Sequence, residues 1–327
     1  MLGAFLALCS AATFALNNAF ARRGVLTGSV FQAMSISVPI GVPMFFLGAM
    51  LTGGLGYFLE FSAKAYFYFA LAGILHFAWG RYCNYRAVKA IGSNLAGPLQ
   101  ESSVLIALFL AVFLLGENLT GLKIIGIILV LCGPLVVVEV GKKKEKKPGA
   151  AKPTFTPLYA EGYLFAGLSA LGYGSSPILI KSALESSGPG ASLAGGTISY
   201  LAATLVVAAV ILGTGSLRNV TNIERTNAKW FLFAGLLVGV SQMLRYLALS
   251  VAPVSVVAPI QRLSLIFRML FGWLMNREHE IFSWRLVAGT GVSLIGAVLL
   301  ALSLESVVSW SVMPEWMRAA ATWSTAR

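Results

Sequence analysis

Charged residues are scarce in this sequence. They make up only 11% of its 327 residues, against about 25% in an ordinary soluble domain. Aspartate is absent, so all 12 acidic residues are glutamates. The chain is 57% hydrophobic, and no soluble core of this length could bury so much apolar surface. A soluble protein is therefore excluded, and we expect lipid to cover most of the apolar side chains.

Residues that hold metals or support redox chemistry are also few. Cys9, Cys83 and Cys132 lie in separate apolar segments and form no CxxC pair. His76 and His279 lack the spacing of metal ligands. No paired aspartates and no His–Glu metal spacing occur inside the apolar segments, which argues against a membrane-embedded enzyme. We expect no metal and no cofactor.

The net charge of +12 could suggest a nucleic acid partner. Most of the basic residues lie, however, in loops between apolar segments, and no soluble basic face with aromatic side chains is present. Charges that set the topology in a membrane are the better interpretation. We expect no binding to nucleic acid.

Ten apolar segments are each long enough to cross a bilayer, which takes about twenty residues. They cover residues 2–21, 30–51, 65–85, 94–115, 121–140, 161–181, 190–213, 229–249, 254–275 and 283–303. Each segment is apolar on all sides, as expected for a helix in lipid, and none shows the alternation of a strand. The sequence therefore predicts an all-α polytopic membrane protein with ten transmembrane helices.

A long internal repeat organises these segments. Residues 96–126 return as residues 257–289, with Pro98 equivalent to Pro259 and Gln100 equivalent to Gln261. Five segments lie in each half, and an odd number turns the second half over in the membrane. The prediction is two inverted five-helix repeats, an architecture that transporters use.

The chain divides into four predicted regions. Residues 1–140 and 159–303 are the two repeats. Residues 141–158, rich in lysine and proline, are a flexible linker. Residues 304–327 contain three tryptophans and are expected to lie in the membrane interface. Most basic loop residues fall on the linker side, which predicts that this side is cytoplasmic and that both termini are external.

Charged residues inside the segments need a specific reason, because a charge near the bilayer centre costs about 2.5–3.5 kcal/mol. Glu101 and Arg262 occupy equivalent positions of the two repeats, each roughly seven residues inside its segment. Because the halves are inverted, we expect the two side chains to approach each other or a shared substrate. A purely structural ion pair is the alternative.

Other polar residues could line the same cavity at mid-depth. The predicted substrate site consists of Glu101, Arg262, Gln100, Gln261, Asn17, His76, Trp79, Tyr173, Gln242, Arg245 and Arg268. Its cations outnumber its carboxylates, which favours an anionic or zwitterionic substrate. His76 could carry a proton. Arg81 is expected to extend toward the membrane surface instead. The two prolines either sit in the first turn of a helix or free carbonyl groups inside it.

Several motifs occur in a fixed order along the chain. They are the paired Pro-x-Gln openings, the loop at residues 116–120 followed by Gly126, and the Tyr-x-Ala ends of the third and eighth segments. This ordered set resembles the drug/metabolite transporter superfamily of EamA type. The resemblance implies ten helices around a central cavity lined largely by the first, third, fourth, sixth, eighth and ninth, with no cofactor. It also implies export or exchange of small metabolites, amino acids or drugs. Relatives usually keep both termini in the cytoplasm, which opposes the charge pattern here.

The function predicted is secondary transport of a small metabolite by alternating access in the cell (inner or plasma) membrane. The alternatives are an exporter of cationic drugs and a non-transporting scaffold or sensor. Expected partners are the small-molecule substrate, the lipid bilayer and either a coupled proton or an exchange substrate. We expect a monomer or a weak dimer.

Overall fold

The computed structural model describes residues 2–100, 102–115, 121–122, 124–129, 132, 156–184, 188–252, 254–302 and 315. Glu101 lies outside these residues. So do the predicted linker, apart from residues 156–158, and the predicted tail, apart from Glu315.

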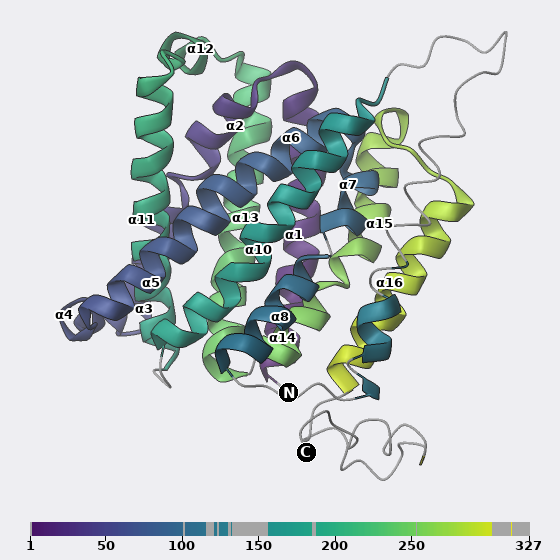
Figure 1. Cartoon of the computed structure of the whole chain (residues 1–327). Coiled ribbons are helices and arrows are strands. Elements are labelled where there is room, and N and C mark those ends of the chain that lie inside the picture. The colour runs from purple at the N-terminus through teal and green to yellow at the C-terminus, as the bar shows by residue number, and fades with distance from the viewer. Residues whose placement is uncertain are drawn as a thin grey trace, which may run out of the picture.

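All regular structure in the described residues is helical (Figure 1). The first half contains α1 (Leu2–Thr27), α2 (Val30–Ser37), α3 (Gly41–Leu51), η1 (Gly54–Gly56), α4 (Tyr57–Glu60), α5 (Ala63–Gly73), the π-helix η2 (Ile74–Gly80), α6 (Arg81–Ile91), α7 (Ser93–Gln100) and α8 (Ser103–Leu115). The second half contains α10 (Tyr159–Leu184), α11 (Pro189–Gly213), α12 (Leu217–Thr221), α13 (Arg225–Val251), α14 (Val254–Gln261), α15 (Ser264–Asn276), η3 (Arg277–His279) and α16 (Trp284–Leu302).

Among the described residues, five helices are long and apolar enough to cross a membrane: α1, α2 with α3 counted as one, α10, α11 and α13. A sixth is obtained if residues 54–60 and 63–91, which are bent by 115° relative to each other, form one span. A helical membrane protein is therefore confirmed, and the number of ten spans stays a prediction.

The predicted fourth and ninth segments are each broken at the same place. α7 ends at Gln100 and α8 begins at Ser103, whereas α14 ends at Gln261 and α15 begins at Ser264. In the second half a tight turn joins the pieces, closed by a hydrogen bond from the Leu263 amide to a carbonyl three residues earlier, 3.1 Å away. Pro98 and Pro259 are each the sixth residue of the preceding helix. Neither is a first-turn proline, and each weakens its helix just before the break.

The first helices of the two halves run in opposite directions. α1 begins where α13 ends, because Gly3 packs against Ala252. α10 ends at that same end, where the Lys181 ammonium group donates to the Leu249 carbonyl, 3.2 Å away. Figure 1 shows α1 rising and α10 descending. The observed directions agree with those of an inverted repeat.

One end of the molecule is strongly basic. It is the end at which α1, α6 and α15 finish and at which α10 and α13 begin (Figure 1). Arg22, Arg23, Arg86, Lys89 and Arg277 gather there. We call it the basic end, and it collects side chains that the sequence assigned to the linker side.

The two halves pack through matched pairs of helices. α1 packs mainly on α13 and α15 of the second half, and α10 packs mainly on α5, η2, α6 and α8 of the first half.

A tyrosine–serine hydrogen bond is found at equivalent positions within each half. The Tyr85 hydroxyl donates to Ser37 Oγ at 3.2 Å, and the Tyr246 hydroxyl donates to Ser199 Oγ at 2.9 Å. The repeat seen in the sequence is thus also a repeat of buried contacts.

Candidate functional site

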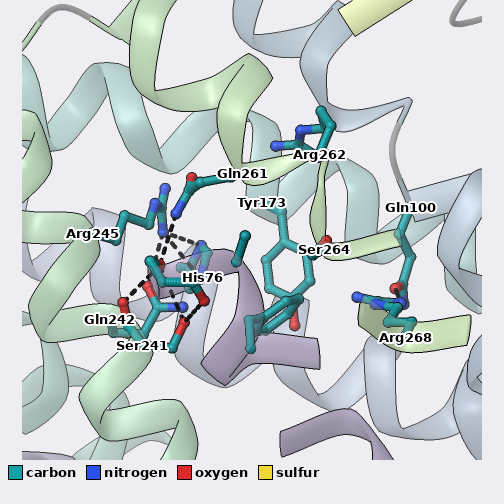
Figure 2. A pocket seen from close by; sticks show the side chains of 13 residues that line it. His76, Gln100, Tyr173, Ser241, Gln242, Arg245, Gln261, Arg262, Ser264 and Arg268 are labelled. Atoms are coloured by element: carbon teal, nitrogen blue, oxygen red, sulfur yellow. Dashed lines mark hydrogen bonds between the residues drawn. The ribbon is translucent and has the colours of Figure 1, made fainter. Parts of the chain in front are cut away.

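A small polar cavity lies where the two halves meet (Figure 2). Its volume is ≈ 50 Å³. α1, η2, α7, α10, α13, α14 and α15 contribute to its wall. It is lined by Ser10, Ala11, Phe14, His76, Gln100, Tyr173, Ser241, Gln242, Arg245, Gln261, Arg262, Ser264 and Arg268. The wall therefore comes from the same six segments that the resemblance in sequence implies.

A cluster around Arg245 forms one side of the cavity; we call Arg245, His76, Ser176 and Gln242 the histidine cluster. Arg245 Nη1 lies 3.1 Å from both ring nitrogens of His76 and donates to Gln242 Oε1 at 3.1 Å. Arg245 Nη2 donates to Ser176 Oγ at 2.9 Å, and His76 Nδ1 is 2.8 Å from the same oxygen. A guanidinium group can only donate. The His76 nitrogen that receives its hydrogen bond must therefore carry no proton.

The π-helix places His76 in this cluster. In a π-helix the turn is wider than in an α-helix, and such turns are frequent at functional sites. His76 is the third residue of η2, is buried, and lies with its ring centroid 4.5 Å from that of Tyr173. The wider turn presents His76 to α10 and α13 rather than to lipid.

A second cluster lies on the other side of the Tyr173 ring (Figure 2). We call Arg268, Gln100, Asn84 and Asn18 the amide cluster. Arg268 Nη1 donates to Gln100 Oε1 at 2.7 Å, and Gln100 Nε2 donates to Asn84 Oδ1 at 2.5 Å. Asn84 Nδ2 in turn donates to Asn18 Oδ1 at 3.1 Å. The chain of amides connects α15 of the second half to α7, α6 and α1 of the first.

The two broken segments meet the cavity between these clusters. Gln261 Nε2 donates to Ser10 Oγ at 3.1 Å. Ser10 Oγ in turn donates to the Ser241 carbonyl at 2.8 Å. Arg262 Nη1 donates to Ser103 Oγ, 2.8 Å away, in the helix that follows Glu101. Arg262 is therefore held against the broken segment of the other half.

The sequence profile described as the EamA-like transporter family matches the chain over residues 1–139 and 160–302. This chain belongs to the EamA-like transporter family. Membership supports a transporter of small molecules rather than an enzyme, and a multi-pass integral membrane protein. A search of curated proteins returns no match.

The fold of this EamA-like transporter is also found among solved structures. One, titled "Crystal structure of protein", has a TM-score of 0.59 and 18% sequence identity to this chain. The match covers 92% of this chain and 96% of that one. At this identity the similarity shows the fold alone.

Most of the predicted site residues of this transporter surround the one cavity. His76, Gln100, Tyr173, Gln242, Arg245, Gln261, Arg262 and Arg268 line it. Their role in binding stays a prediction. Glu101, which the sequence pairs with Arg262, lies outside the described residues.

Two predicted residues lie elsewhere. Trp79 lines an apolar pocket on the outer side of η2 and donates from Nε1 to the Leu168 carbonyl at 3.2 Å. An α-helix would place residues three apart on one face, but the π-helical turn directs Trp79 away from His76. Asn17 is buried between α1 and α13. With its amide oriented to satisfy both atoms, it donates to the Ala234 carbonyl at 3.0 Å. Asn17 therefore joins two helices instead of lining the cavity.

Arg81 also departs from its expected position. Arg81 is only 2% exposed, so its side chain does not extend toward the membrane surface. Nη1 donates to the Ser37 carbonyl and Nη2 to the Tyr200 hydroxyl, both at 2.9 Å. The guanidinium group also lies 5.2 Å from the centre of the Phe77 ring. These partners make burial of the charge tolerable.

Several lining residues were not among those predicted. They are Ser10, Ala11, Phe14, Ser241 and Ser264. A signal for two of them was present, since Ser10 and Phe14 have the repeat equivalents Ser169 and Tyr173. The Phe14 and Tyr173 rings indeed meet, with centroids 6.0 Å apart. No comparable signal in the sequence points to Ser241 and Ser264, because serine is common inside membrane spans.

Ser176 and Ser175 allow a matched test of the histidine cluster. We expect Ser176→Ala to lower the free energy of unfolding by about 1–3 kcal/mol, because Arg245 Nη2 loses its buried acceptor and His76 Nδ1 loses its hydrogen-bond partner. Among the described residues, the Ser175 hydroxyl bonds to two carbonyls of its own helix, those of Leu171 and Gly172. Ser175→Ala should therefore change stability by a few tenths of a kcal/mol at most. Thermal unfolding of both purified variants checks this, and equal losses would contradict the cluster.

Proposed function

We propose that this protein is a secondary transporter of a small anionic or zwitterionic solute. In this proposal ten transmembrane helices form two inverted five-helix repeats in the cell (inner or plasma) membrane. The halves work by alternating access around the cavity that they enclose. The observation that carries the proposal is the set of arginines around that cavity.

Three arginines face the cavity, and no carboxylate is among the described residues that line it. Arg245 and Arg268 are almost fully buried, at 3% and 2% exposed. Buried charge is costly unless it is compensated. Arg245 donates to neutral acceptors, Gln242 and Ser176, and a carboxylate or phosphate group would bind it more strongly because its hydrogen bonds are charge-assisted. An anionic group on the solute is the chemistry that fits.

The broken helices support a site at mid-depth. Secondary transporters bind substrates near the bilayer midplane, where discontinuous helices end. Ser264, the first residue of α15, lines the cavity. The N-terminal end of a helix carries partial positive charge, which adds to the attraction for an anion.

The size of the cavity suggests how the transporter works. A water molecule needs roughly 10–15 Å³ of such space, so ≈ 50 Å³ admits a few waters. Pockets for small organic ligands are usually several times larger, about 300 Å³ or more. A solute therefore enters only when side chains such as Gln261 or the helices themselves move apart. That behaviour is expected of a carrier between its two open states.

The alternatives receive less support from the site. A cationic drug would meet three arginines, so export of cations is disfavoured by charge. A scaffold or sensor would not need a polar cavity between its halves. The proposal includes either a coupled proton, for which His76 in the cavity wall is the candidate carrier, or the exchange of two solutes.

A ligand screen combined with one substitution tests the proposal. We expect amino acids, organic acids or sugar phosphates, and not lipophilic cations, to raise the thermal unfolding temperature of the purified protein. Arg245→Gln should then weaken binding of the stabilising compound by about 10- to 100-fold, the value of one charge-assisted contact. Arg86→Gln is the control, because Arg86 pairs with Glu161 outside the cavity. Stabilisation by lipophilic cations only would contradict the proposal.

The predicted Glu101–Arg262 pair is tested separately. We expect Arg262→Gln to reduce flux of the identified solute into proteoliposomes by at least about tenfold, since a charge that meets the acidic group is lost. Glu101→Gln should do the same for a zwitterionic solute, whose cationic group loses its carboxylate. A structural ion pair gives another result. Flux would then survive both single substitutions while the unfolding temperature falls.

A further inference from the structure

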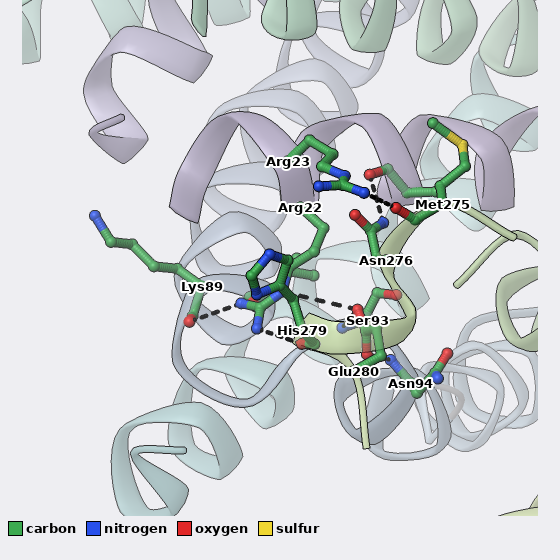
Figure 3. Close-up of polar contacts among 11 residues, drawn as sticks. Arg22, Arg23, Lys89, Ser93, Asn94, Met275, Asn276, His279 and Glu280 are labelled. Carbon is green, nitrogen blue, oxygen red and sulfur yellow. Dashed lines mark hydrogen bonds and ion pairs between the residues drawn. The ribbon is translucent and has the colours of Figure 1, made fainter. Parts of the chain in front are cut away.

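Three helices that line the cavity come together again at the basic end (Figure 3). From Phe14 to Arg22 on α1, and from Arg268 to Asn276 on α15, the chain advances eight residues. This distance is about two helical turns, or roughly 12 Å. α7 begins at the same level, at Ser93. The contacts that join the ends of α1 and α15 to the beginning of α7 therefore decide whether the cavity opens at the basic end.

Glu280 of the second half holds the beginning of α7 in the first half. Its Oε1 accepts from the Ser93 amide at 2.8 Å, and its Oε2 accepts from the Asn94 amide at 3.0 Å. The side chain is fully buried. Gly92, just before α7, has φ +82°, and a Cβ there would lie 2.7 Å from Glu280 Oε2. Only glycine allows both the turn and the approach of the carboxylate.

Arg22 holds the end of α6 on the other side of the same turn. Nη1 donates to the Val88 and Lys89 carbonyls at 2.6 and 3.0 Å. Nη2 donates to the His279 carbonyl of the second half at 2.7 Å, and Nε lies 3.8 Å from Glu280 Oε1. The cation thus meets the negative end of one helix while Glu280 meets the positive end of the next, which is the favourable placement for both charges.

Further contacts across the halves surround this pair. Asn276 Nδ2 donates to the Ala19 carbonyl at 2.9 Å, and Arg23 donates to the Met275 carbonyl. Gly272 of α15 lies between these contacts at the basic end and the cavity. A Cβ at this residue would lie 2.9 Å from Asn94 Oδ1. α7 and α15 therefore pack closely there and leave little room for a solute to pass.

We propose that Arg22, Ser93, Asn94, Asn276 and Glu280 form a latch that closes the basic end of the cavity. The latch opens when Glu280 leaves the amides of α7 and the end of α15 moves away from α1. This inference rests on the proposed function, because an opening at this end matters only in a carrier. Glu280 is the decisive residue, since it binds both the α7 amides and the cation of α1.

Accessibility of a cysteine in the cavity tests the latch without any knowledge of the solute. Cys9, Cys83 and Cys132 are replaced by alanine, and Ala11→Cys serves as the reporter because Ala11 lines the cavity. Membrane-impermeant methanethiosulfonate is added to vesicles from one side at a time. A separate Arg277→Cys variant identifies the side that the basic end faces. We expect Glu280→Gln to raise the labelling rate from that side by roughly tenfold, with no rise from the opposite side.

Two further variants make the result decisive. Glu278→Gln removes an exposed carboxylate from the same loop and should leave the labelling rate unchanged. Asn276→Ala removes a neutral contact of the latch and should give a smaller rise from the basic side only. If Glu280→Gln does not fold, the labelling rate of Asn276→Ala tests the latch. Unchanged basic-side labelling in the folded variants, or an equal rise from both sides, overturns the latch. Because labelling needs no solute, a failed flux assay alone does not affect this result.

Discussion

Every buried arginine in the described part of this protein bridges its two halves. Arg22 of the first half bonds to the His279 carbonyl of the second, and Arg81 bonds to Tyr200. Arg245 and Arg268 of the second half meet His76 and Gln100 of the first. A cation in a medium of low dielectric must keep partners. The halves therefore cannot move apart without giving the arginines new partners, and this constraint connects the fold to the transport that we propose.

The arginines at the cavity and at the basic end differ in whether a solute could replace their hydrogen-bond partners. Around the cavity, Arg245 donates to the neutral side chains of Gln242 and Ser176, so an anionic solute can substitute for them at a net gain. At the basic end the partner of Arg22 is already a carboxylate, supported by two backbone amides. In the transport that we propose, a solute that binds in the cavity would weaken the bridges around it and leave those at the basic end closed. The two halves would then separate at one end at a time.

The sequence predicted the repeat and much of the cavity, because Pro98–Gln100 and Pro259–Gln261 mark the same position in both halves. It did not predict the breaks after Gln100 and Gln261, since a proline alone does not say whether a helix bends or ends. Trp79 was misplaced because a π-helix leaves no clear signature in a run such as residues 74–80. Arg81 was misplaced because its partners, Ser37 and Tyr200, are distant in sequence. The latch was visible only as an unusual second loop, Asn276–Glu280.

An experimental structure of the protein with its stabilising solute bound tests the central claim most directly. The predicted result is a solute between the two halves, with its acidic group within hydrogen-bonding distance of Arg245 and with Tyr173 beside it. A solute bound in the apolar pocket around Trp79, or bound with no contact to any arginine of the cavity, would contradict it.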